Sequence, residues 1–234
     1  MLYVSRPEEN SPELVKFFEA VQDNRDTVLH MPNAVTWPVY DWNDVNRHFN
    51  SYATKDNIEI IKDTNKISVP VQKDINNWIP AGKIDRGECR KILNEPNTGF
   101  VITQGCDYHS PFIANMCANL EMIFNGIAGA HVYGGVSETY KNSSFPMHWD
   151  KTLNVILQLD GESHWTVYNE SGEEDKTITE DEATPAYSEL LAPGDLLYIP
   201  ARRYHKCVPK SRRLSLSFCC APNRGQVVRE LHVL

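Results

Sequence analysis

Apolar residues recur with two different periods along this chain, and the change of period falls near its middle. Before residue 127, four segments place apolar residues three or four positions apart, which is the spacing of amphipathic helices. These predicted helices cover residues 11–22, 42–52, 84–96 and 110–126. Shorter segments between them alternate in polarity and predict strands at 58–63, 66–72 and 99–105. Residues 1–127 are therefore expected to form a mixed α/β lead-in.

The segment 110–126 has the clearest helical pattern. Phe112, Met116 and Leu120 form an apolar stripe, which is typical of a helix that packs on a core. Gly126 is the candidate C-cap of this helix, because glycine readily adopts the left-handed conformation that ends many helices.

Beyond Gly126 the pattern becomes that of short strands. Segments rich in Val, Ile, Leu, Tyr and Ser are separated by Gly, Pro, Asn and Asp, and they cover 128–136, 152–161, 163–169, 188–200, 205–209 and 213–222. Many short strands at this spacing predict a sandwich or a barrel. We expect a mainly β fold, with a small antiparallel barrel at 128–222 and the lead-in helices packed on its outside. No linker is evident, so residues 1–234 are expected to form a single domain.

The composition narrows the class of partner. The 234 residues are 41% hydrophobic, enough for a sizeable core, and carry a formal net charge of −8. Binding to nucleic acid or to an anionic membrane draws on many Lys and Arg residues, so neither partner is expected. The six cysteines form no CxxC pair and resemble neither a disulfide framework nor a zinc motif. With no apolar leader segment and no run of 18 apolar residues, we expect a cytoplasmic protein.

Candidate chemistry begins at residues 143–165, SSFPMHWDKTLNVILQLDGESHW. His148 and Asp150 are two positions apart, and on a strand such residues point to the same face. His205 ends the segment PGDLLYIPARRYH and is the candidate third ligand, delivered from a neighbouring strand. Two imidazoles and one carboxylate form the facial triad that holds Fe(II) and leaves positions open. An isolated HxD is often only a hydrogen-bonded pair, but PGDLLYIP before a histidine at this distance is much rarer.

The segments HWDKTLNVILQLDGESHWTVY, LAPGDLLYIPARRYH and LSLSF resemble the JmjC and cupin-like branch of the 2-oxoglutarate oxygenases. Over residues 128–222 the residue pattern is most similar to that of the ribosomal oxygenases and the asparaginyl hydroxylase-like enzymes. The resemblance implies a double-stranded β-helix, a jelly-roll barrel in which HxD…H holds Fe(II) with 2-oxoglutarate as cosubstrate and dioxygen as co-reactant. It also implies that Asn154 and Ser217 line the cosubstrate pocket.

The chain departs from this family at Ser163. Relatives usually carry there a Lys that pairs with the distal carboxylate of 2-oxoglutarate, and a serine cannot balance that buried charge. Arg213 and Ser215 share the inward face of the last strand with Ser217, by the period of two. We hypothesise that Arg213 grips the carboxylate with its bidentate fork and that Ser215 adds a hydroxyl. Alternatively, Arg213 belongs to a surface basic turn, KSRR; Lys141 and Tyr133 are weaker candidates.

Basic residues also crowd around His205, where they could attract an anion to the barrel mouth or simply form a solvated loop: Arg202, Arg203, Lys206, Lys210, Arg212 and Arg213. Two further histidines are weaker candidates. His164 alternates outward if Ser163 points inward, and His131 is interpreted as a core residue.

The resemblance implies hydroxylation of a C–H bond, since the carboxylate ligand Asp150 is present. A protein or peptide side chain is the first expectation for the substrate. A small amino-acid-like molecule is the second, because the ribosomal oxygenases continue beyond the barrel whereas this chain ends about a dozen residues after the last expected strand. The alternative class is a non-oxygenase, metal-binding cupin, either an isomerase or a small-ligand-binding protein. The intact HxD…H argues against a metal-free interaction module, and the oligomeric state stays open.

Overall fold

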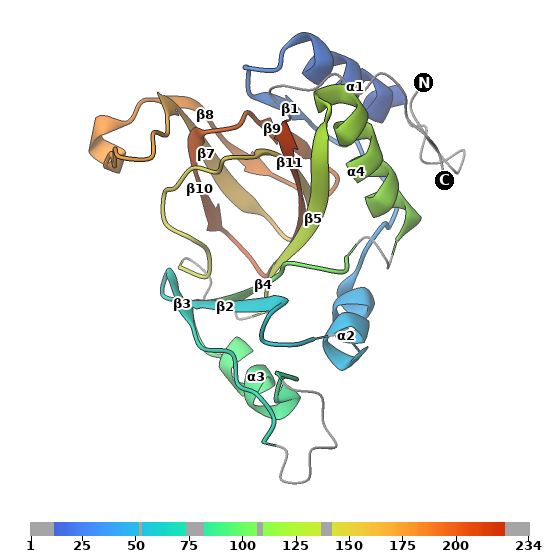
Figure 1. Ribbon diagram of the computed structural model, residues 1–234, viewed down its shortest axis with the longest axis vertical. Coiled ribbons are helices and arrows are strands. Elements are labelled where there is room, and N and C mark those ends of the chain that lie inside the picture. Colours follow the sequence, from blue (N-terminus) through green and yellow to red (C-terminus); the bar gives the residue numbers. More distant parts are fainter. Residues whose placement is uncertain (1–11, 52, 74–81, 107–109, 137–141, 223–234) are drawn as a thin grey trace.

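The computed structural model describes residues 12–51, 53–73, 82–106, 110–136 and 142–222. Most of their regular structure is β, in two antiparallel sheets (Figure 1). The larger sheet has the order β1-β9-β6-β11-β5-β4-β2-β3, and the smaller has the order β10-β7-β8. The strands of the larger sheet are β1 (Leu29–Met31), β2 (Ile58–Lys62), β3 (Asn65–Ile67), β4 (Thr98–Ile102), β5 (Gly126–Gly135), β6 (Leu153–Asp160), β9 (Leu196–Ile199) and β11 (Arg213–Pro222). Those of the smaller sheet are β7 (Ser163–Ser171), β8 (Pro185–Leu191) and β10 (Arg203–Pro209).

The barrel lies between the smaller sheet and the strands β9, β6, β11 and β5 of the larger one. Along β6, Val155 and Leu157 belong to the large core on the outer face, whereas Ile156 belongs to a second core inside the barrel. That inner core also contains Trp165 and Val167 of β7. Because successive side chains of these strands face two different apolar cores, their sequences are short and almost continuously apolar. The predicted double-stranded β-helix is confirmed.

Four α-helices accompany the sheets in the described part of the chain: α1 (Pro12–Asp23), α2 (Trp42–Ser51), α3 (Arg86–Leu93) and α4 (Pro111–Phe124). Figure 1 shows α4 running beside β5, on the side of the sheet away from β7 and β10. Phe112 of α4 meets Phe218 of β11 edge-to-face, with ring centroids 6.4 Å apart, a spacing typical of packed aromatic side chains. None of the described helices has the length and apolarity needed to span a bilayer.

Two expectations about local structure were wrong. The helix at 110–126 ends at Asn125, which adopts the left-handed conformation with φ 48°, while Gly126 already begins β5. Asparagine tolerates this conformation because its short polar side chain bonds locally. The strand expected at 66–72 is only Asn65–Ile67, and Pro70 cannot donate to a ladder. The lead-in also does more than cover the barrel, because β1 and β2–β4 extend its larger sheet.

The strand β4 approaches the loop before the HxD motif so closely that only glycine fits at one position. A Cβ atom on Gly99 would lie 2.3 Å from the backbone oxygen of Ser143, whereas a Cβ on Gly129 of β5 would meet nothing within 4 Å. Since backbone cannot rotate away as a side chain does, Gly99 marks a contact that positions the loop.

We expect Gly99→Ala to lower the free energy of unfolding by about 1–3 kcal/mol, the usual cost of overpacking. The matched variant Gly129→Ala should change it by less than about 0.5 kcal/mol. Urea denaturation followed by circular dichroism measures both. Equal effects of the two substitutions would contradict the close approach at Gly99.

Candidate metal centre

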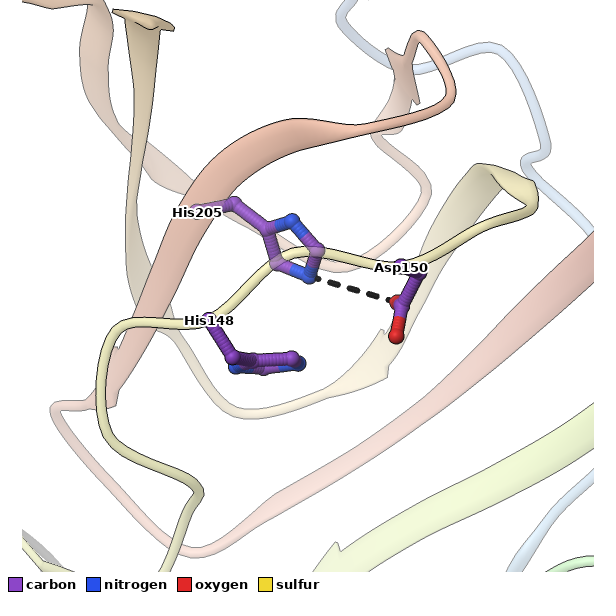
Figure 2. Close-up of side chains that lie close together, drawn as sticks. All are labelled: His148, Asp150 and His205. Carbon is purple, nitrogen blue, oxygen red and sulfur yellow. Dashed lines mark ion pairs between the residues drawn. The ribbon is translucent and has the colours of Figure 1, made fainter. Parts of the chain in front are cut away.

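His148, Asp150 and His205 converge at the mouth of the barrel (Figure 2). Their ligand atoms all lie within 4.8 Å of one another, and the Nε2 atom of His205 is 3.6 Å from Oδ2 of Asp150. Protein nitrogen and oxygen ligands lie about 2.0–2.2 Å from a metal ion, so two ligands of one ion lie about 3–4 Å apart. The His205–Asp150 pair already has this spacing, and the set of three ligand atoms is compact enough to hold one ion.

Backbone pairing brings the two histidines together. His148 and His205 exchange two backbone hydrogen bonds of 3.1 and 2.8 Å, which adds the loop before β6 to the edge of the smaller sheet. As a result the two imidazole rings have centroids 4.4 Å apart. The prediction that a neighbouring strand delivers His205 is confirmed. His148 and Asp150, however, lie in a loop with one isolated bridge, not on a regular strand.

Both imidazoles are held in the same tautomer. The Nδ1 atom of His148 lies 2.8 Å from the carbonyl of Pro146, and Nδ1 of His205 lies 2.9 Å from the carbonyl of Arg203. A carbonyl only accepts hydrogen bonds, so each Nδ1 carries the proton and donates it. Each Nε2 then presents its lone pair to the space between the ligands, as a metal site requires.

Burial keeps His205 neutral. The pKa of His205 is lowered to about 4, chiefly by burial and also by the neighbouring His148, against the opposing effect of the Asp150 carboxylate. A neutral imidazole is the form that binds a metal.

Asp150 is oriented from two sides. The Asn154 side chain donates a hydrogen bond of 2.9 Å to Oδ2 of Asp150, and the Ser217 hydroxyl donates to Oδ1 of Asn154 at 3.3 Å. The backbone N–H of Arg202 donates to the carbonyl of Asp150 at 2.8 Å. Such outer contacts fix the direction of a ligating carboxylate. Asn154 and Ser217, predicted from the resemblance to line the pocket, thus also support the ligand.

A pocket continues inward from the three ligands. It is lined by Tyr133, Ser144, Phe145, His148, Asp150, Asn154, Ile156, Trp165, His205, Cys207, Arg213 and Ser217. Its apolar side chains form one wall of the pocket. Its polar side chains lie on β11, on β5 and around the three candidate ligands. The chemistry that this donor set allows is metal binding at the mouth and anion binding in the interior.

Arg213 supplies the positive charge of the pocket. The residue is only 2% exposed, and its guanidinium donates to the Cys207 Sγ atom at 2.7 Å and to the Ser144 hydroxyl at 3.2 Å. Burial raises the pKa of the Cys207 thiol, so this partner stays neutral. The Nε atom of Arg213 is buried and, within the described residues, has no hydrogen-bond partner. A buried charge without a counter-charge is costly by several kcal/mol, so this guanidinium favours an anionic ligand.

Two other predicted pocket residues are buried but do not line the pocket. Ser163 begins β7 and Ser215 lies in β11, at 0% and 2% exposure. Their direct contact with a cosubstrate stays a prediction. Lys141 lies outside the described residues, whereas Tyr133 lines the pocket with its ring 6.0 Å from the Arg213 guanidinium carbon.

Two of the six basic residues near His205 have acidic partners. Lys206 pairs with Glu180, and Arg212 pairs with Asp160. Of the six, only Arg213 lines the pocket. His164 is half-buried on β7, and His131 has its Nδ1 atom 3.7 Å from the Cys219 sulfur; neither lines the pocket.

Sequence reasoning missed Ser144 and Cys207, the two partners of Arg213. Cys207 is two positions after His205 on β10, so strand parity could have placed it on the same face. Ser144 lies in a loop and offers no periodic signal.

A protein-family comparison matches residues 109–227 to the JmjC domain. The chain belongs to the JmjC domain family. Among curated relatives, this JmjC domain is 29% identical over 130 residues to the bifunctional lysine-specific demethylase and histidyl-hydroxylase NO66 of Drosophila willistoni, covering 52% of this chain and 16% of that protein. It is 35% identical over 91 residues to ribosomal oxygenase 2 of Mus musculus, covering 37% of this chain and 19% of that protein. The JmjC domain thus spans less than a fifth of either relative.

Solved structures share the fold. The X-ray structure of ycfD from Escherichia coli has a TM-score of 0.62 at 14% identity, covering 88% of this chain and 53% of that one. The ribosomal oxygenase YcfD in complex with cobalt and 2-oxoglutarate has a TM-score of 0.58 at 14% identity, covering 84% of this chain and 49% of that one. Identity at this level supports the fold alone.

We expect His148→Ala to abolish tight binding of Co(II), because it removes a ligand whose Nε2 atom is already directed at the site. Visible absorption of the Co(II) complex and calorimetric titration measure the loss. The matched variant His164→Ala alters a histidine outside the pocket and should bind Co(II) like the unaltered protein. Unchanged binding by His148→Ala would contradict the assignment of the ligand.

Proposed function

We propose that this JmjC domain is an Fe(II)- and 2-oxoglutarate-dependent dioxygenase that hydroxylates a C–H bond. One observation carries the proposal: a two-histidine, one-carboxylate set opens into a pocket that contains the buried Arg213, whose Nε atom has no hydrogen-bond partner among the described residues. Iron in such a set, with 2-oxoglutarate and dioxygen, supplies the oxidising power for C–H hydroxylation. The protein contributes binding, orientation and exclusion of water.

In this proposal each polar group has a defined task. His148, Asp150 and His205 hold the ion, while Asn154 keeps the Asp150 carboxylate turned toward it. Arg213 binds the distal carboxylate of 2-oxoglutarate, the task given in relatives to a lysine where this chain has Ser163. Its two Nη groups are already oriented by neutral partners, and its Nε–H is still available.

The apolar wall has a task as well. Phe145 packs edge-to-face near His148, and the Trp165 ring centroid lies 6.2 Å from that of His205. Together with Ile156 these side chains keep bulk water from the ligands and the cosubstrate. Exclusion of water strengthens every charge interaction in the pocket and prevents side reactions.

A protein or peptide side chain is the proposed substrate, ahead of a small amino-acid-like molecule. The names of the relatives, ribosomal oxygenase and histidyl-hydroxylase, support a protein side chain. We also propose a cytoplasmic location, which agrees with six free cysteines. The alternative is a cupin without oxygenase activity, and the absent lysine is its best support; in the present proposal Arg213 takes over the task of that lysine.

We expect Fe(II) and 2-oxoglutarate, mixed with the protein without oxygen, to give a weak visible charge-transfer band. Admission of oxygen should then release succinate, even without an added substrate. Absence of both the band and succinate, together with tight binding of another divalent metal, would favour the non-oxygenase cupin.

Arg213→Gln should weaken the apparent affinity for 2-oxoglutarate about tenfold or more, because charge-assisted hydrogen bonds to the carboxylate are lost. The charge-transfer band, titrated with 2-oxoglutarate, measures the affinity. Arg212→Gln is the matched control, since Arg212 is an exposed neighbour paired with Asp160, and its titration should be unchanged. Retained Co(II) binding shows that Arg213→Gln is folded; an unaltered affinity in the folded variant would refute the role of Arg213.

A further inference from the structure

A second cavity, of about 290 Å³, lies between α2 and α3. It is lined by Trp42, Val45, Asn46, Phe49, Asn50, Arg86, Cys89, Arg90, Leu93, Asn94, Phe100 and Val136. None of these residues lines the pocket at the metal centre. In Figure 1 both helices lie at the end of the molecule that holds β2 and β3, away from β7 and β8.

The cavity opens on the outer face of the larger sheet. Phe100 of β4 points outward and belongs to the large core. Its neighbour Gly99 faces the other way, toward the loop at Ser143 that leads to the HxD motif. The sheet therefore separates this cavity from the metal centre, and a ligand bound here would not contact the metal ligands.

The body of the cavity is aromatic. The ring of Phe49 meets Phe100 edge-to-face at 5.3 Å between centroids, and Trp42 meets Phe100 in the same way at 6.4 Å. Phe49 and Trp42 nevertheless remain only half-buried, as does Leu93 of α3. An apolar ligand that covered these three side chains would remove their remaining apolar surface from water.

The rim of the cavity is positively charged. Arg86 and Arg90 are four positions apart and so lie on one face of α3. The lining contains these two arginines and no acidic residue, although the whole chain has a net charge of −8. The rim is thus a local departure from the charge of the chain, and it is complementary to an anion.

The two arginines retain donors for a ligand. Arg86 donates to the Asn50 side chain across the cavity at 2.9 Å, which ties α3 to α2 and uses one of five guanidinium N–H groups. The Arg90 side chain is exposed and has no hydrogen-bond or ion-pair partner in the part of the chain that the structure describes. The amide of Asn46 adds a neutral polar group to the rim.

We propose that this cavity is a binding site for an amphipathic carboxylate with a one- or two-ring aromatic body. The ring lies against Phe49, Phe100 and Trp42, and the carboxylate binds Arg90, supported by Arg86. The volume is at the small end of the range for ligand pockets, which suits a compound of this size rather than a peptide helix. The site is independent of the function proposed for the metal centre.

The probe for this site is 2-naphthylacetate, titrated into ¹⁵N-labelled protein and followed by NMR. Trp42 lines this cavity and Trp165 lines the metal pocket, so their indole N–H signals report the two sites separately. We expect a saturable shift of the Trp42 signal, with Kd about 1 mM or below, and a constant Trp165 signal. A shift of the Trp165 signal alone, or no saturable shift of Trp42, would overturn the proposal.

Two comparisons test the carboxylate contact. The neutral analogue 2-naphthylacetamide should bind about tenfold more weakly, as should 2-naphthylacetate to Arg90→Gln. Arg47→Gln is the matched control, because Arg47 is an exposed arginine of α2 that pairs with Asp44 and does not line the cavity; its affinity should be unchanged. Equal affinity of acid and amide, or an equal loss in both variants, would refute recognition of the carboxylate by Arg90.

Discussion

Two backbone hydrogen bonds between His148 and His205 organise the metal centre. They attach the loop before β6 to β10 and fix the separation of the two imidazoles. Each ring is then oriented by a carbonyl two residues earlier in its own segment, Pro146 or Arg203. The geometry of the two histidines is thus set by local backbone, whereas Asp150 is oriented by the side chains of Asn154 and Ser217. This arrangement explains how a loop outside regular secondary structure can hold a ligand in place.

The charges of the site are divided between the two sheets. Both histidines belong to the edge of the smaller sheet, whereas Arg213 and the Asn154–Ser217 pair that supports Asp150 belong to the larger one. Arg213 donates across the barrel to Cys207 on β10. The cation is therefore on the opposite wall from Ser163, the position where relatives carry a lysine. Two neutral groups each accept one hydrogen bond from this buried cation, Cys207 on β10 and Ser144 in the loop before β6.

Much of this architecture could be predicted from the sequence, because it follows from residue periodicity. Alternating residues of β6 face two different cores, whereas on β11 apolar residues of the large core alternate with Arg213, Ser215 and Ser217. This period of two located the strands and predicted the inward face of Arg213. The spacing of His148, Asp150 and His205 predicted the three candidate ligands that the structure brings together. Loop contacts were not predictable, since Ser144 approaches Arg213 without any regular spacing. The helix end at Asn125 was missed because two residue types compete for the left-handed position.

The cavity between α2 and α3 shows a similar limit of prediction from the sequence. The cavity between α2 and α3 depends on two helices that are distant in sequence, and their relative placement follows from the sheet. Helical spacing could have put Arg86 and Arg90 on one face, but only the fold shows that this face lies opposite Phe49.

The division of the site between two sheets has a geometric consequence. In the proposed arrangement the metal is held mainly from one wall and the distal carboxylate from the other. The separation of the two walls therefore determines which length of dicarboxylate fits between them. The inner core of Ile156, Trp165 and Val167 keeps that separation constant. Selectivity between oxo-diacids of different chain length would then depend on the packing of these uncharged core side chains.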